Sequence, residues 1–393
     1  MTRSVQRSVP SSLMPRRDFL HVAAGAVAAT AAMPTARAGH AGTIRLGLIG
    51  CGGRGTGAAT QAALADPEVE IVAIGDAFAD HASSAADHLA RDVGERFACP
   101  PQRRFSGPDA FRRVLDAGVD AVVIAAPPHL RPQHVNAAVA AGCHVFCETP
   151  AATDVAGVLE IEMAFARARV AGLSVASGLH ARRDAEVIAA IDGVHAGSIG
   201  RPLRVEVSAA RGAPWRVPTR PGWTAAEARL RNWITDDALS GGPFVERSVH
   251  AIDRALWVLG DRAPEFAEPL AGGRAQSGAV RYRFTDGAEI VAVPRIDDGV
   301  HGETVTGTRG GCGLRLSGDG RRFQATMTQF IAGIRCGRGL DEAGILVRGT
   351  LAAIMGRRVS VSRRPLAWAE LAAADAPASP ALQIDGGVNL GDV

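Results

Sequence analysis

The chain has no lysine among its 393 residues, and Tyr282 is its only tyrosine. Enzymes that work through a lysine Schiff base, including ordinary pyridoxal phosphate enzymes, are therefore excluded, as is the catalytic Tyr-Lys pair of short-chain dehydrogenases. The six cysteines show no C-x-x-C spacing, so the sequence predicts no metal site. Cys51 and Cys147 are expected to be buried free thiols, and the sequence gives no disulfide pairing.

The first 38 residues read as a targeting segment rather than as part of the fold. Arg16 and Arg17 precede an apolar run over residues 22–33, and residues 36–38 are Ala-Arg-Ala, with small side chains where a signal peptidase cleaves. The run is too short to span a membrane. The arginine pair resembles a twin-arginine export signal, although Pro15 replaces the usual Ser or Thr, and a periplasmic protein is expected. The alternative is an uncleaved basic leader on a cytosolic protein.

The charge balance excludes two classes of partner. The leader carries five arginines and one aspartate, a net +4, so its removal would change the charge of the chain from +3 to −1. Neither nucleic acid nor an anionic membrane is indicated as a partner after cleavage. A small molecule is the expected partner.

A glycine-rich stretch from Thr43 to Gly57 organises the remaining chain. An apolar run over residues 44–49 is typical of a buried parallel strand, and it stops at glycines with G-x-G-x-x-G spacing. Such glycines let the backbone approach a pyrophosphate at the N-terminus of the next helix, expected over residues 56–65. The alternative is a glycine-rich turn in a flavodoxin-like sheet that binds nothing.

The next strand supports a dinucleotide site. Residues 69–74 form an apolar run that leads to Asp76, at the usual distance from the glycines. A carboxylate there accepts hydrogen bonds from a ribose 2′-hydroxyl and repels a 2′-phosphate, which favours NAD. NADP stays open because Arg54 adjoins the loop. The residues assigned to the cofactor are Gly50, Gly52, Gly53, Arg54, Gly55, Asp76, Pro127 and Glu148.

Two domains follow from the pattern of strands and helices. Strands and helices alternate over residues 42–149, which predicts an α/β Rossmann domain with a doubly wound parallel sheet. Residues 150–372 contain alternating strands and an Asp-Gly hairpin turn, which predicts an α+β domain with an open, mostly antiparallel sheet for the substrate. Residues 373–393 are expected to form a tail. The long segment 212–242 is expected to cover a site.

One helix carries a candidate catalytic group. Glu246, His250 and Asp253 have i, i+4 and i+7 spacing, so they share one face if the segment is helical. Imidazole takes a proton from an alcohol near neutral pH, and neighbouring carboxylates orient it. A polar helix face with a histidine that caps or pairs explains the pattern equally well.

The glycine loop, the turn Cys147-Glu148-Thr149-Pro150 and the helix with an acid four residues before a histidine resemble the Gfo/Idh/MocA family, over about residues 43 to 365. The resemblance is closest to exported members, through Leu230-Arg-Asn-Trp233 and Ser240-Gly-Gly. It implies an oxidoreductase that binds NAD or NADP tightly and acts on a sugar or cyclitol, and a homo-oligomer that uses the open sheet as its interface. It implies that His250 is catalytic, with Glu246 in the place of a common aspartate. The substrate residues implied or expected are His180, Arg182, Arg183, Arg231, Trp233 and Asp253.

The chain departs from this family at Thr149. The family has Glu-Lys-Pro where this chain has Glu-Thr-Pro, and no other lysine is available. Thr149 orients a hydroxyl but supplies no ammonium, so the proton is expected to go to His250, aided by Glu246.

An exported enzyme without a soluble nicotinamide pool must recycle its cofactor within the site. That requirement fits a self-recycling sugar oxidoreductase, our leading prediction. It also fits an NAD-dependent glycoside hydrolase that works by oxidation, elimination, addition and reduction. A non-catalytic binding protein of the same fold is the third possibility.

Overall fold

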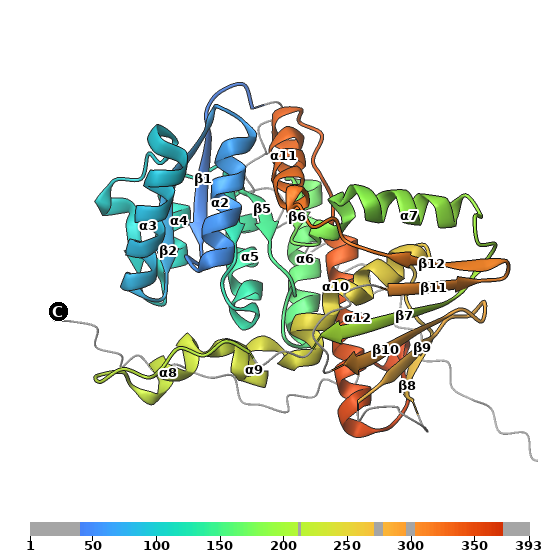
Figure 1. Ribbon diagram of the computed structural model, residues 1–393. Helices are drawn as coiled ribbons and strands as arrows, with labels where there is room; N and C mark the ends of the chain where they lie inside the picture. The colour runs from blue at the N-terminus through green and yellow to red at the C-terminus, as the bar shows by residue number, and fades with distance from the viewer. Residues whose placement is uncertain (1–39, 211–213, 271–277, 296–302, 372–393) are drawn as a thin grey trace, which may run out of the picture.

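The computed structural model describes residues 40–210, 214–270, 278–295 and 303–371 (Figure 1). The predicted leader and the predicted tail lie outside these residues. Two sheets, each covered by helices, stand side by side, and α10 and α12 lie at the junction between them. In the described part of the chain, we find no helix with the length and apolarity needed to cross a membrane.

The first sheet has six parallel strands in the order β3-β2-β1-β4-β5-β6. The strands are β1 (Ile44–Ile49), β2 (Val69–Asp76), β3 (Arg104–Ser106), β4 (Ala121–Ile124), β5 (His144–Cys147) and β6 (Val175–Ser177). Their apolar side chains are buried on both faces, as continuous apolar runs require. The predicted doubly wound sheet is confirmed, and its strand order reverses between β1 and β4, where a ligand crevice is expected.

Helices cover both faces of this sheet. The bounds are α2 (Gly53–Ala65), α3 (Ala79–Val93), α4 (Ala110–Asp116), α5 (Arg131–Ala140), α6 (Val155–Val170) and α11 (Arg321–Arg335). One core lies between the sheet and α2, α3 and α11, and the other between the sheet and α4, α5 and α6. No sequence pattern indicated that α11, from the late part of the chain, would return to the first domain.

The boundary between the domains differs from the prediction. The second domain was predicted to begin at residue 150, but β6, which lies within that range, pairs with β5 in parallel register. The connecting helix α6 packs on the same sheet through Ile161 and Phe165. The parallel sheet therefore extends to Ser177 instead of ending before Pro150, because a strand, helix and strand in sequence form a crossover that continues a parallel sheet.

The second sheet has seven strands in the order β12-β11-β7-β10-β9-β8-β13. The strands are β7 (Pro202–Ala210), β8 (Phe266–Pro269), β9 (Val280–Arg283), β10 (Glu289–Arg295), β11 (Glu303–Gly307), β12 (Gly310–Leu314) and β13 (Leu366–Ala367). Only β7 and β10 pair in parallel; the other pairs are antiparallel, as predicted. Its core is shared with α7 (Ala185–His195), α10 (Gly242–Val258) and α12 (Ala343–Ser362).

Two local predictions have different outcomes. The Asp286-Gly287 hairpin is confirmed, since β9 and β10 are antiparallel and Gly287 has a φ of +82°, which glycine adopts without strain. The long segment 212–242, expected to cover a site, contains α8 (Ala225–Arg231), a 3-10 turn η6 (Trp233–Thr235) and α9 (Asp237–Ser240). All six cysteines are free, and Cys51 and Cys147 are buried, as expected.

Candidate active site

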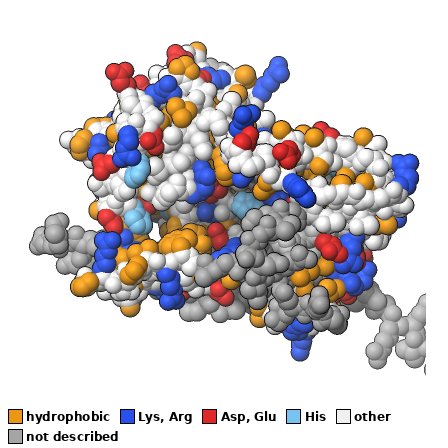
Figure 2. Space-filling model, in the orientation of Figure 1, with side chains coloured by type: hydrophobic (Ala, Val, Ile, Leu, Met, Phe, Trp, Pro, Cys, Tyr) orange, Lys and Arg blue, Asp and Glu red, His pale blue; other side chains and the backbone are white. Residues whose placement is uncertain are grey.

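The candidate site lies where the carboxyl ends of the parallel strands face α10 of the second domain. Figure 2 shows arginine, carboxylate and histidine side chains gathered in the middle of the molecule, between the two domains. Asp76 ends β2, the turn from Glu148 to Pro150 follows β5, and His250 lies in the middle of α10. Pro127 lies after β4, next to a 3-10 turn, η4 (Pro128–Leu130).

The glycine loop has the shape that a pyrophosphate needs. Gly50 has a φ of +97°, and a Cβ there would lie 2.4 Å from the backbone nitrogen of Ala126. A Cβ on Gly55 would lie 2.0 Å from the carbonyl oxygen of Gly50, so both positions require glycine. Gly52 and Gly53 are exposed, and a Cβ added at either position would have no other atom within 4 Å. Helix α2 begins at Gly53, three residues earlier than predicted, so its N-terminal N–H groups adjoin this open space.

Asp76 is held in position beside the loop. Its carboxylate accepts hydrogen bonds from the backbone N–H of Cys51 at 2.7 Å and of Phe78 at 3.0 Å. Nδ1 of His81 lies 3.3 Å from the same carboxylate, whose hydrogen bond raises the pKa of His81. The carboxylate thus has a fixed orientation at the end of β2, where a ribose hydroxyl is recognised.

Arg54 and His180 both contact Glu148. Nε of Arg54 lies 3.3 Å from a Glu148 oxygen. His180 is buried, and its Nε2 lies 3.4 Å from Glu148 while Nδ1 lies 3.1 Å from the Thr326 hydroxyl. His180 therefore positions Glu148, and the predicted roles of Arg54 toward the cofactor and of His180 toward the substrate stay predictions. Burial alone would raise the pKa of Glu148, but His180, Arg54 and Arg131 lower it to about 2.

Arg131 is a structural residue of the site that the sequence did not indicate. Its buried guanidinium donates to the carbonyl oxygens of Ala126 at 2.8 Å, of Glu148 at 3.0 Å and of Pro150. It thereby joins the loop after β4 to the turn after β5. An arginine at a helix start carries no local signal for this role, because its partners are backbone oxygens from two other segments.

Thr149 and His250 meet across the cleft. The Thr149 hydroxyl oxygen lies 3.2 Å from Nε2 of His250, which joins the end of the parallel sheet to the middle of α10. The Thr149–Pro150 peptide bond is cis. These two residues were predicted to act together, and the structure places them in hydrogen-bonding contact.

His250 is a neutral base at physiological pH. Burial lowers the pKa of its imidazole to about 4, and the positive charge of Arg254, one turn along α10, acts in the same direction. A neutral imidazole has a lone pair that accepts a proton from a hydroxyl group. Arg254 itself is buried and makes two hydrogen bonds to Glu303 on β11.

Glu246 presents an unpaired carboxyl group to the cleft. Its Oε2 atom is buried and has no hydrogen-bond partner among the described residues. Burial raises the pKa of Glu246 from 4.5 to about 7, and the charge of Glu148 adds to this effect while Arg131 and Arg247 oppose it. Near neutral pH this side chain therefore exchanges a proton readily, as a general acid or base must.

The shifted pKa of Glu246 predicts a pH-dependent stability effect. Because the pKa is higher in the folded chain, the folded state holds a proton that the unfolded state releases, and stability falls as the pH rises through 7. Glu246→Gln should therefore be more stable than the wild type at pH 8, by about 3 kcal/mol, with a much smaller difference at pH 5. Chemical denaturation at both pH values measures the difference.

The exposed Glu162 on α6 provides the matched control for this experiment. Glu162→Gln makes the same chemical change in solvent, so its stability should follow the wild type at both pH values. An equal gain for Glu246→Gln at pH 5 and pH 8 would contradict the assigned pKa, since a neutral carboxyl group gains nothing from the substitution.

Arg182 and Asp253, both predicted to contact the substrate, form an ion pair with each other. The Arg182 guanidinium donates to Asp253 at 2.7 Å and also to Asp261, and it stacks on Trp257 with 5.1 Å to the ring centre. Both side chains are buried, with 8% and 2% exposed. Asp253 therefore orients Arg182 and not His250, and the pair joins α10 to the 3-10 turn η5 (His180–Arg183).

Three other predicted substrate residues also have partners within the chain. Arg183 pairs with Glu342, which also accepts from the backbone and hydroxyl of Ser177. Arg231 donates two hydrogen bonds to Asp80 on α3, near the end of β2. Trp233 packs edge-on against Trp215, with 6.3 Å between the ring centres. The substrate roles of these residues stay predictions.

The fold and the site define a two-domain protein whose first domain has the crevice of a dinucleotide-binding sheet. Residues 44–177 match the model of the Gfo/Idh/MocA oxidoreductase family, which is described by its NAD-binding Rossmann fold. The matched residues include all six strands of the parallel sheet, from β1 to β6. The glycine loop and Asp76 are thus parts of an NAD-binding domain.

Relatives of known name match part of the chain. A 1,5-anhydro-D-fructose reductase of Ensifer adhaerens is 29% identical over 251 residues, 64% of this chain and 60% of the relative. An inositol 2-dehydrogenase of Saccharopolyspora erythraea is 33% identical over 220 residues, 56% of this chain and 54% of the relative. The matches thus span little more than half of the length of these relatives.

Solved structures show that the fold extends over both domains. A scyllo-inositol dehydrogenase of Lactobacillus casei with bound NAD(H) and scyllo-inositol superposes with a TM-score of 0.64 at 20% identity, over 83% of this chain and 99% of that chain. An enzyme of gentamicin A biosynthesis in complex with NAD gives a TM-score of 0.62 at 17% identity, over 84% and 98%. At these identities the likeness concerns the fold.

Proposed function

We propose that the chain is an NAD-dependent oxidoreductase that acts on a secondary alcohol or ketone carbon of a sugar or cyclitol. The contact between Thr149 and His250 carries this proposal, because it puts a neutral base and a hydroxyl group at the end of β5 in an NAD-binding domain. The names of the partial relatives, inositol 2-dehydrogenases and an anhydrofructose reductase, support a polyol substrate.

The residues fit NAD in particular. Gly52 and Gly53 leave the loop open, Asp76 is oriented at the ribose position, and the first N–H groups of α2 adjoin the loop. The surroundings of Asp76 include Asp80 and one arginine, Arg231, that is already paired with carboxylates. A 2′-phosphate would meet more negative than positive charge there, which favours NAD over NADP.

The proton transfer is assigned to the side chains of this chain. NAD, when bound, would supply the acceptor for the hydride of the carbon that carries the reacting hydroxyl. His250 takes the hydroxyl proton on its neutral imidazole, and Thr149 orients the hydroxyl by a hydrogen bond. The carboxyl group of Glu246, one turn before His250 on α10, is a second group that gives or takes a proton. In the reverse direction the same groups return the proton to the alkoxide oxygen. No ammonium group is needed.

We further propose that the protein is exported to the periplasm and keeps its cofactor through many turnovers. This part rests on Arg16, Arg17 and the apolar run that follows them in the sequence. A retained cofactor must be regenerated by a second substrate, so we propose oxidation of one polyol coupled to reduction of another carbonyl compound. Fractionation of cells that express the wild type or Arg16→Ala/Arg17→Ala tests the location.

We also propose a homo-oligomer formed through the open face of the second sheet. This face carries complementary charges, including pairs of Arg204 and of Arg281 with Glu289. A second copy related by a two-fold axis can exchange such pairs across an isologous interface. Light scattering of the purified protein measures the mass in solution.

The first test of the proposed function identifies the nucleotide. Protein purified without added cofactor is denatured, and the released nucleotide is identified by mass and absorbance. We expect about one NAD per chain, and reduction of the nicotinamide when myo-inositol or another polyol is added to the native protein. Protein that neither carries nor binds NAD or NADP would refute the proposal. Release of nitrophenol from a nitrophenyl glycoside without net reduction would favour the hydrolase instead.

A further inference from the structure

The segment from residue 214 to Gly241, called the arm below, follows the carboxyl edge of the parallel sheet. Figure 1 shows α8 and α9 in line beneath the first domain, before the chain enters α10. The arm belongs to the second half of the sequence, yet its contacts at either end are with the first domain. These contacts lie at the ends of β2 and β4, the two sides of the expected dinucleotide crevice.

Arg231 makes the contact at the end of β2. It donates two hydrogen bonds of 2.9 Å to Asp80, in the first turn of α3, and a third to Glu227 of the arm. Its guanidinium lies 3.9 Å from the ring centre of Phe78 and 4.5 Å from that of Trp223. Only 10% of the side chain is exposed. A cation between two aromatic rings and two carboxylates is a strong point of attachment.

This attachment adjoins the carboxylate that recognises the ribose. Nη1 of Arg231 lies 3.5 Å from Nε2 of His81, whose Nδ1 lies 3.3 Å from Asp76. Phe78, under the guanidinium, donates its backbone N–H to Asp76. The arm is therefore separated from Asp76 by one side chain, and it borders the place where the adenosine half of a dinucleotide lies in this fold.

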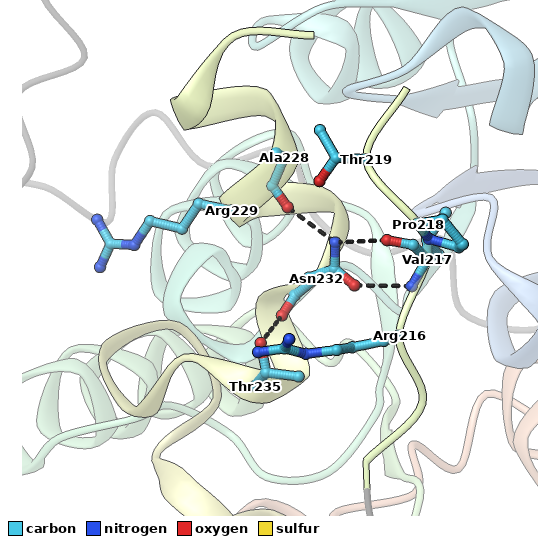
Figure 3. A pocket seen from close by; sticks show the side chains of 8 residues that line it. All are labelled: Arg216, Val217, Pro218, Thr219, Ala228, Arg229, Asn232 and Thr235. Atoms are coloured by element: carbon cyan, nitrogen blue, oxygen red, sulfur yellow. Dashed lines mark hydrogen bonds between the residues drawn. The ribbon is translucent and has the colours of Figure 1, made fainter. Parts of the chain in front are cut away.

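The other end of the arm is attached near the end of β4. The carbonyl oxygen of Leu239 lies 3.2 Å from Nδ1 of His129, in the turn after β4. Within the arm, Asn232 joins α8 to the extended residues 216–219 through two hydrogen bonds with the backbone of Val217, at 2.8 and 3.1 Å (Figure 3). The arm is thus a two-layered unit that is attached at both sides of the crevice.

We infer that the arm is a clasp that closes over the adenosine half of a bound dinucleotide and slows its release, with Arg231 as the anchor. The inference rests on the proposed function, because it requires NAD in the crevice. Release of the cofactor requires the arm to lift from the end of β2, which breaks the contacts of Arg231 with Phe78 and Asp80. Such a barrier affects the dissociation rate most, and it fits a protein that keeps its cofactor.

The test compares two arginines of the same helix. Arg231→Ala removes the anchor, while Arg229→Ala removes an arginine that pairs with Asp236 inside the arm. NADH is bound to each protein, and its dissociation is followed by fluorescence after addition of excess NAD. We expect Arg231→Ala to release NADH about tenfold faster and to retain less nucleotide through purification. Arg229→Ala should behave as the wild type.

A second pair of variants covers the case in which Arg231→Ala unfolds the arm. Asp80→Arg alone should accelerate release, and Asp80→Arg combined with Arg231→Asp should restore part of the slow release by reversing the ion pair. Equal release rates in the wild type and all variants would overturn the clasp, as would equal acceleration by Arg229→Ala. A wild type that binds no nucleotide would instead refute the proposed function.

Discussion

His250→Asn is expected to lower kcat for the oxidation of a polyol by about a thousandfold, the range typical of a lost general base. Asparagine is a shorter polar side chain whose amide reaches the position of Nδ1 but not that of Nε2, so it also removes the partner that lies 3.2 Å from the Thr149 hydroxyl. It does not accept a proton at neutral pH. The nucleotide content and the thermal stability of the variant should stay close to those of the wild type, because the glycine loop and Asp76 are untouched.

Two further variants separate a chemical role from a structural one. His88 is exposed on α3, so His88→Asn makes the same substitution outside the cleft and should leave kcat unchanged. Thr149→Val keeps the side-chain volume and removes the hydroxyl group, which should lower kcat by about tenfold if it orients the substrate. Full activity of His250→Asn would refute the assignment of His250 as the base. Loss of bound nucleotide in that variant would assign it a structural role.

The sequence predicted those parts of the site that are encoded locally. Gly50, Gly52 and Gly55 could be identified because a tight turn between a strand and a helix requires them at fixed spacing, and Asp76 because it ends the next strand. The pair of Thr149 and His250 came from the family resemblance and not from spacing, since the two residues are 101 positions apart.

The contacts that the sequence did not indicate are those of long side chains whose partners lie far away in the sequence. Helical spacing put Glu246, His250 and Asp253 on one face, but seven residues extend about 10 Å along a helix, so the last of them meets a different neighbour. That neighbour is Arg182, 71 positions away. An arginine without a carboxylate nearby in the sequence suggests a cation that is free to bind a substrate. A buried charge needs a partner, however, and here the partners come from distant segments.

The arm likewise depends on partners that are distant in the sequence. The length of segment 212–242 indicated that it covers a site, but not which one. The contact of Arg231 with Phe78 and Asp80 depends on the packing of the second domain beside the first, and 151 positions separate the two ion-pair partners. The return of α11 to the first domain is of the same kind.

Gly52→Val is expected to weaken NAD binding by about a hundredfold, equal to about 2.7 kcal/mol, with a cost to folding of about 1 kcal/mol or less. Gly52 has a φ of −70° and a ψ of 175°, which valine adopts readily, and a built Cβ has no atom within 4 Å. The added methyl groups point into the space beside the first turn of α2, where the pyrophosphate must approach the backbone. Calorimetric titration of nucleotide-free protein with NAD measures the affinity.

Two glycines of the same loop make this experiment specific. Gly55→Val should lower both affinity and thermal stability, because its Cβ would lie 2.0 Å from the carbonyl oxygen of Gly50. Gly57→Ala should change neither by much, since the nearest atom, at 3.3 Å, belongs to the movable end of Arg54. If Gly52→Val binds NAD as the wild type does, the pyrophosphate does not approach this loop, and the cofactor site must be sought elsewhere. If it loses stability as Gly55→Val does, the open space at Gly52 is needed by the fold and is not evidence for a ligand.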